Sequence, residues 1–131
     1  MRREIVIHSL GHARAALAAA AACGKEVVTL ASAPGAAQQA GPGWFKAVIE
    51  QASAAYPQVR VAAILDCSDQ PGPAMAALRL GLKDLRFLGA AELREKLTGM
   101  GAVLAPPPEA SLDLREFKEP ETACAAFLRE A

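Results

Sequence analysis

The sequence has few aromatic residues, few cysteines and no block of like charge. Only 5% of its 131 residues are aromatic while 53% are hydrophobic, so we expect a core of Val, Ile, Leu and Met in which Ala lets elements approach closely. Lys plus Arg and Asp plus Glu number 14 each, which gives a formal net charge of zero. Proteins that bind nucleic acids or membrane surfaces normally carry a basic patch. We therefore expect neither kind of partner.

The cysteines do not form a recognisable motif. Cys23, Cys67 and Cys124 are far apart, with no CxxC pair and no short Cys/His spacing, so neither a disulfide framework nor a metal site is predicted. The chain also has no GxGxxG or GxxxxGK[ST] pattern, and no cofactor is expected. The first 23 residues resemble a weak export signal, but Glu4 and His8 interrupt the apolar stretch. We expect a cytoplasmic protein.

Short apolar runs alternate with helix-forming segments along the chain. Strands are predicted over 3–9, 25–32, 59–66, 83–89 and 101–105, with helices between them. The intervals are too long for hairpins, which favours βαβ units and a parallel sheet. We predict a three-layer α/β/α fold with a five-stranded, mainly parallel sheet of flavodoxin-like plan. The alternative is half of a βα-barrel that completes itself by oligomerisation.

The last quarter of the chain differs from the rest in composition. Residues 1–105 are predicted to form a single α/β domain. Residues 106–131 begin with a proline-rich, charged connection and end in a helix that places Cys124, Phe127 and Leu128 on one stripe. We expect this helix to pack on the same domain or on a partner chain.

Residues 48–100 carry a pattern of helix, proline, buried strand, helix, strand and helix, in "AAYPQVRVAAIL" and "AMAALRLGLKDLRFLGAAELREKL". This pattern resembles the second half of a response-regulator receiver domain. The resemblance implies a flavodoxin-like architecture, but receivers have an acidic pair after the first strand, where this chain has His8 and Ser9. The phosphoacceptor aspartate is also missing, because residues 33–43 contain no Asp or Glu. A degenerate receiver-like domain without phosphorylation is therefore one alternative.

In open parallel α/β sheets, ligands bind beyond the carboxyl ends of the strands, beside helix N-termini. Two loops that follow predicted strands, 8–12 and 66–72, hold most of the polar side chains, and a crevice between their strands is the favoured site. The residues expected to bind a ligand are Ser9, Gly11, His12, Ser32, Asp66, Cys67, Ser68 and Asp69.

The loop 66–72 allows more than one interpretation. Ser68 or Asp69 is expected to cap the following helix, while Asp66 either touches a ligand or holds the loop by hydrogen bonds. Cys67 could be a thiolate activated by a helix N-terminus, but the neighbouring carboxylates would raise its pKa. Because no base lies nearby in sequence, no catalytic residue is assigned.

The helix predicted over 11–23 is apolar nearly all round, with Arg14 its only charge after His12. It is either an exposed alanine helix or a helix with a second buried face, which predicts a homodimer. The favoured function is a non-catalytic module that binds a small anion or a protein at the carboxyl-end crevice. The alternative is a small enzyme that uses Asp66, Cys67 or His12 in that crevice.

Overall fold

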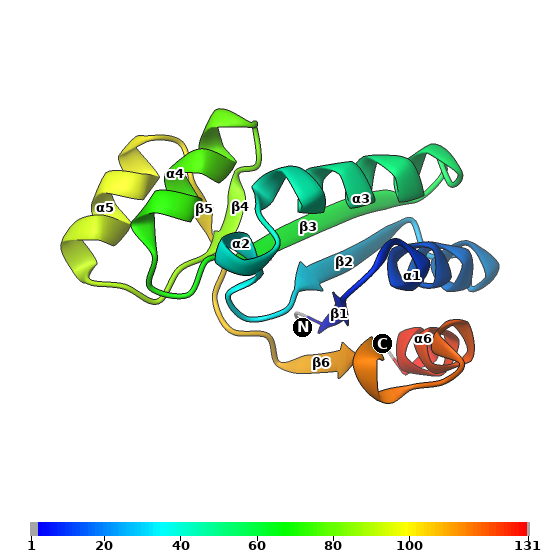
Figure 1. The fold of residues 1–131 in the computed structure, drawn as a ribbon. Helices are drawn as coiled ribbons and strands as arrows, with labels where there is room; N and C mark the ends of the chain where they lie inside the picture. Colours follow the sequence, from blue (N-terminus) through cyan, green and yellow to red (C-terminus); the bar gives the residue numbers. More distant parts are fainter. Residues whose placement is uncertain (1–2, 131) are drawn as a thin grey trace. The chain divides into compact units, whose positions relative to one another are not determined.

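The computed structural model describes residues 3–130, in which strands and helices alternate (Figure 1). The strands are β1 (Arg3–Ile7), β2 (Val27–Ser32), β3 (Arg60–Asp66), β4 (Asp84–Arg86), β5 (Val103–Leu104) and β6 (Ala110–Asp113). The helices are α1 (Leu10–Ala22), α2 (Ala36–Gln39), α3 (Pro42–Ala54), α4 (Pro71–Arg79), α5 (Ala91–Gly99) and α6 (Pro120–Arg129), with a 3-10 helix η1 (Leu114–Glu116).

The strands of the described residues form one six-stranded sheet in the order β5-β4-β3-β2-β1-β6. β1 pairs with β6, β3 with β4 and β4 with β5, all in parallel. The predicted α/β class with a parallel sheet is therefore confirmed, with six strands rather than five. The strand order differs from the 2-1-3-4-5 order of flavodoxin-like sheets, because β1 to β5 follow one another and β6 lies beside β1.

β6 lies at the start of residues 106–131, where we predicted a proline-rich, charged connection instead of a strand. In parallel register with β1, Leu112 pairs with Ile5 and Asp113 with Val6. Polar and apolar residues alternate through Ser111, Leu112, Asp113, Leu114 and Arg115, which is the period of a strand with one buried face. The run is short, charged and preceded by three prolines, and these features hid the strand signal.

The chain divides into two compact units. The first comprises the described parts of Met1–Ala31, Val48–Ala63 and Pro108–Ala131, and the second comprises Ser32–Ala47 and Ile64–Pro107. Each unit has buried apolar residues of its own. In the first they include Ile5, Ile7, Leu17, Leu114 and Cys124.

Helix α1 is the centre of the first unit. It contacts β1 and lies side by side with α6 (Figure 1). Its buried residues are almost all alanines, namely Ala13, Ala16, Leu17, Ala19 and Ala20, and small side chains let α6 approach closely. The second apolar face of α1 is thus covered by α6 of the same chain.

The second unit is built around larger side chains. Phe45, Leu65, Leu85, Phe87 and Leu97 are all fully buried or nearly so. Helix α4 contacts α2 and α5, and α5 contacts β5. No helix within residues 3–130 is long and apolar enough to cross a bilayer.

Candidate functional site

Three polar side chains of the first unit meet where β1 and β6 end. His8 follows β1 directly, Asp113 is the last residue of β6, and Arg115 lies in η1 just beyond it. The His8 Nε2 atom lies 2.6 Å from Asp113 Oδ1, and Arg115 Nη2 lies 3.1 Å from His8 Nδ1. Parallel pairing places the carboxyl ends of both strands at the same edge, so residues more than 100 positions apart become neighbours. We call these three residues the His8 cluster.

The two contacts define the protonation of the His8 ring. A guanidinium group can only donate hydrogen bonds, so Nδ1 accepts from Arg115 and the ring proton is on Nε2. That Nε2–H donates to the Asp113 carboxylate. Both ring nitrogens are therefore engaged, and neither is placed to take a proton from a substrate.

Hydrogen bonds to the Asp113 carboxylate keep it charged near neutral pH. Burial alone would raise the pKa of Asp113, but the backbone N–H of Arg115 and the His8 side chain both donate to it, and its pKa is lowered overall. The Arg115 N–H lies 2.9 Å from Asp113 Oδ1. This bond also caps η1 and fixes the start of the turn that carries Arg115.

Ser9 and His12 extend the His8 cluster onto the start of α1. The Ser9 hydroxyl oxygen accepts from the His12 N–H at 3.1 Å, and His12 Nδ1 accepts from the His8 N–H at 3.0 Å. Burial lowers the pKa of His12, and the neighbouring His8 lowers it further, while Asp113 partly offsets both effects. His12 is therefore neutral at pH values where an ordinary histidine begins to gain charge.

The first turn of helix α1 is suited to hold an anion. Its first turn contains no acidic residue, and the first amides of a helix have no partner within it. Gly11 is exposed in this turn. The positive end of the helix dipole thus lies one residue from His8.

In the second unit, Asp66 holds two loops together. One carboxylate oxygen, Oδ1, accepts from the Gly35 N–H at 3.0 Å and from the Ser68 N–H at 2.9 Å. The Asp66 N–H donates to the Ser32 hydroxyl oxygen at 2.9 Å, and that hydroxyl donates to the Ala33 carbonyl. Asp66 is only 7% exposed. Of the two roles that the sequence allowed, the structure supports loop hydrogen bonding for this oxygen.

The predicted helix cap by Ser68 or Asp69 is wrong. The N-cap of α4 is Gln70, and no side chain caps the helix. Ser68 has a left-handed backbone with φ 52°, and the exposed Asp69 accepts from the Gln70 side chain instead. The reason is that α4 begins at Pro71, which places Asp69 one residue and Ser68 two residues before the N-cap position.

Cys67 is not suited to nucleophilic chemistry. It is fully buried, and its thiol lies 3.7 Å from the Leu65 carbonyl oxygen. Burial, and next the Asp66 carboxylate, raise the pKa of Cys67 to about 12. Near neutral pH the thiolate is therefore scarcely populated.

We expect a thiol-specific chromogenic reagent to modify Cys23 well before Cys67 or Cys124 in the native protein. Cys23 is only partly buried, whereas burial, and next Glu121, raise the pKa of Cys124 to about 12. The measurement is mass spectrometry of the labelled peptides over time, with denatured protein as the control in which all three cysteines react. Rapid labelling of Cys67 in the native protein would contradict this expectation.

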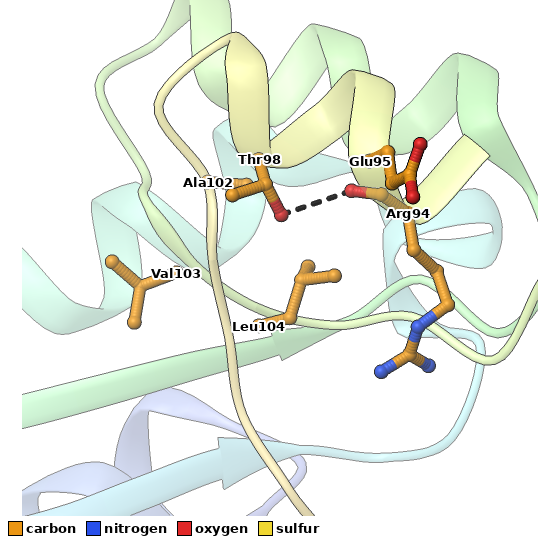
Figure 2. Close-up of a pocket in the computed structure, with 6 residues that line it drawn as sticks. All are labelled: Arg94, Glu95, Thr98, Ala102, Val103 and Leu104. Carbon is orange, nitrogen blue, oxygen red and sulfur yellow. Dashed lines mark hydrogen bonds between the residues drawn. The ribbon is translucent and has the colours of Figure 1, made fainter. Parts of the chain in front are cut away.

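A shallow hollow of about 620 Å³ lies in the second unit, lined by Arg94, Glu95, Thr98, Ala102, Val103 and Leu104 (Figure 2). Two of its polar residues, Arg94 and Thr98, already form hydrogen bonds within the fold. The Thr98 hydroxyl donates to the Arg94 carbonyl at 2.9 Å, and Arg94 Nη1 donates to the Phe87 carbonyl at 2.9 Å. None of the ligand-binding residues predicted from the sequence lines this hollow.

The predicted ligand-binding residues fall in different units. Ser9, Gly11 and His12 lie in the first, where the structure adds His8, Asp113 and Arg115, while the second holds Ser32, Asp66, Cys67, Ser68 and Asp69. Within residues 3–130, no group of three or more His, Cys, Asp or Glu residues could hold a metal ion. No protein-family model matches the chain, and no curated protein is detectably similar to it.

Proposed function

We propose that this protein is a non-catalytic module that binds a small anion, such as a sulfate, phosphate or carboxylate group, at the carboxyl ends of β1 and β6. The observation that carries the proposal is the exposed Arg115 guanidinium held against His8 beside the start of α1. A guanidinium has several N–H donors in a planar fork that matches the oxygens of an anion. Arg115 uses Nη2 on His8, and its other donors can reach a ligand.

The position in the sheet supports the same site. In the sheet, β2 lies on one side of β1 and β6 lies on its other side. Parallel pairing places the carboxyl ends of β1 and β6 side by side, and in open parallel α/β sheets ligands bind beyond the carboxyl ends of the strands. The amides of Leu10 and Gly11, at the start of α1, add to the attraction for negative charge, and no carboxylate in the first turn opposes it.

A binding role fits this arrangement better than catalysis. Both nitrogens of His8 are engaged by protein groups, and the Cys67 thiol is buried and protonated. We also propose that the protein acts in the cytoplasm, which agrees with its three free cysteines. The homodimer stays a prediction, and α6 now covers the apolar face of α1 that suggested it.

We expect the protein to bind sulfate and inorganic phosphate, and Arg115→Ala to weaken that binding at least about tenfold, as for the loss of a charge-assisted hydrogen bond. Calorimetric titration at low ionic strength measures the affinity, and amide NMR shifts of Leu10 and Gly11 locate the ligand. The matched control is Arg79→Ala, which removes an exposed arginine from the end of α4 in the second unit. Equal affinity in Arg115→Ala and the wild type, or no binding by the wild type, would overturn the proposal.

A further inference from the structure

Taking the proposed anion site as given, we infer that His8 competes with the anion for Arg115, so that a proton on His8 frees the guanidinium and anion binding is coupled to proton uptake. The site would then bind its ligand more tightly as the pH falls. The inference starts from the 3.1 Å contact between Arg115 Nη2 and His8 Nδ1.

That contact exists only while His8 is neutral. Arg115 can only donate, so it needs the lone pair on Nδ1. A proton on Nδ1 turns the acceptor into a donor and places two positive groups side by side, and the contact is lost. The Arg115 side chain is exposed, so it can move without disturbing the core.

A proton added to Nδ1 leaves the hydrogen bond on the other side of the ring in place. His8 Nε2 is a donor in both charge states, and it lies 2.6 Å from the Asp113 carboxylate. Protonation converts this neutral–charged hydrogen bond into an ion pair. Asp113 therefore holds the ring in place while Arg115 is released, and η1 stays anchored by the Arg115 N–H on Asp113 Oδ1.

The groups that face His8 are His12 from α1, Asp113 from β6 and Arg115 from η1. Burial, and next the charge of His8, lower the pKa of His12, and the pKa of Asp113 is also lowered despite the opposing effect of burial. Arginine stays charged throughout. Histidine is the side-chain type whose charge ordinarily changes between about pH 5 and 8.

At low pH, two effects both strengthen the binding of the anion. The released Arg115 exchanges the His8 ring for the anion as its acceptor, and the protonated ring adds a positive charge close to the site. Coupling between two ligands is reciprocal. If protons strengthen anion binding, the anion must also draw a proton onto the protein.

The test is calorimetric titration with sulfate, which keeps its charge across this range, at about pH 8 and about pH 5.5. Two buffers of different ionisation enthalpy report the protons taken up on binding. We expect the wild type to bind sulfate roughly five- to tenfold more tightly at the lower pH, with net proton uptake. NMR spectra of the His8 and His12 rings, with and without sulfate, assign the proton to one ring even if a variant fails to fold.

The decisive variant is His8→Gln. Its amide can donate to Asp113 and accept from Arg115 but cannot titrate, so we expect sulfate binding with neither pH dependence nor proton uptake. Arg79→Ala, in α4 of the second unit, is the control and should keep both. If the pH dependence of sulfate binding were unchanged in His8→Gln, or absent in the wild type, the coupling to His8 would be wrong. The proposed anion site would still be supported by the binding itself. A wild type that binds no sulfate at either pH would instead overturn the proposed function.

Discussion

Replacing Asp66 with alanine is expected to lower the free energy of unfolding by about 2–4 kcal/mol. The carboxylate oxygen Oδ1 accepts from the N–H groups of Gly35 and Ser68, and alanine leaves both donors without this acceptor. Each lost partner of a buried or partly buried donor costs about 1–3 kcal/mol. Urea denaturation followed by circular dichroism measures the change.

The matched control is Asp66→Asn, whose side-chain oxygen can accept the same two hydrogen bonds. It loses only the strengthening due to the negative charge, so we expect a loss of about 1 kcal/mol. Wild-type stability in Asp66→Ala would show that the loops do not depend on this carboxylate. Asp66 would then return as a candidate for ligand contact.

Gly89→Ala is expected to lower the free energy of unfolding by about 2–3 kcal/mol, as for an overpacked core. A methyl group at position 89 would overlap the Phe87 ring. That ring is 2% exposed, so it cannot swing into solvent without losing its own packing. Thermal unfolding of the two proteins at equal concentration gives the difference.

Gly99→Ala is the control for Gly89→Ala, because a methyl group there meets no atom within 4 Å beyond its chain neighbours and the nearby backbone of its own helix. Gly99 is the last residue of α5, and alanine in a helix is favoured over glycine by up to about 1 kcal/mol, so stability should hold or rise. In a Phe87→Leu background, Gly89→Ala should cost less, since the smaller side chain leaves room for the methyl group. Equal costs in both backgrounds would show that the ring is not the obstacle.

Local patterns in the sequence were sufficient to predict most of the fold. The apolar run 59–66 predicted the central strand β3, which spans Arg60–Asp66. The alternation of strands and helices predicted a parallel sheet. β6 was missed because the strand spans only Ala110–Asp113 and its signal is masked by the charges and prolines around it.

The candidate site was less accessible to prediction because it depends on which strands are neighbours. His8 and His12 stood out beside β1, but Asp113 and Arg115 become relevant only once β6 is known to pair with β1. Sequence spacing carries no such information for residues 105 positions apart. The role of Asp66 was among the sequence-based alternatives, whereas the cap of α4 was mispredicted because the helix begins at Pro71 and its N-cap position is Gln70 rather than Ser68 or Asp69.

The pairing of β6 with β1 also sets an order for folding on the ribosome. The second unit ends at Pro107, whereas the first needs residues beyond it. β1 is synthesised before every other strand of the described sheet, yet it must wait for β6 and α6 to emerge before its edge is paired and α1 is covered. Contacts between such distant segments slow folding. The nascent chain therefore exposes the apolar surface of α1 until α6 has been synthesised, and the His8 cluster can form only after β6 and η1.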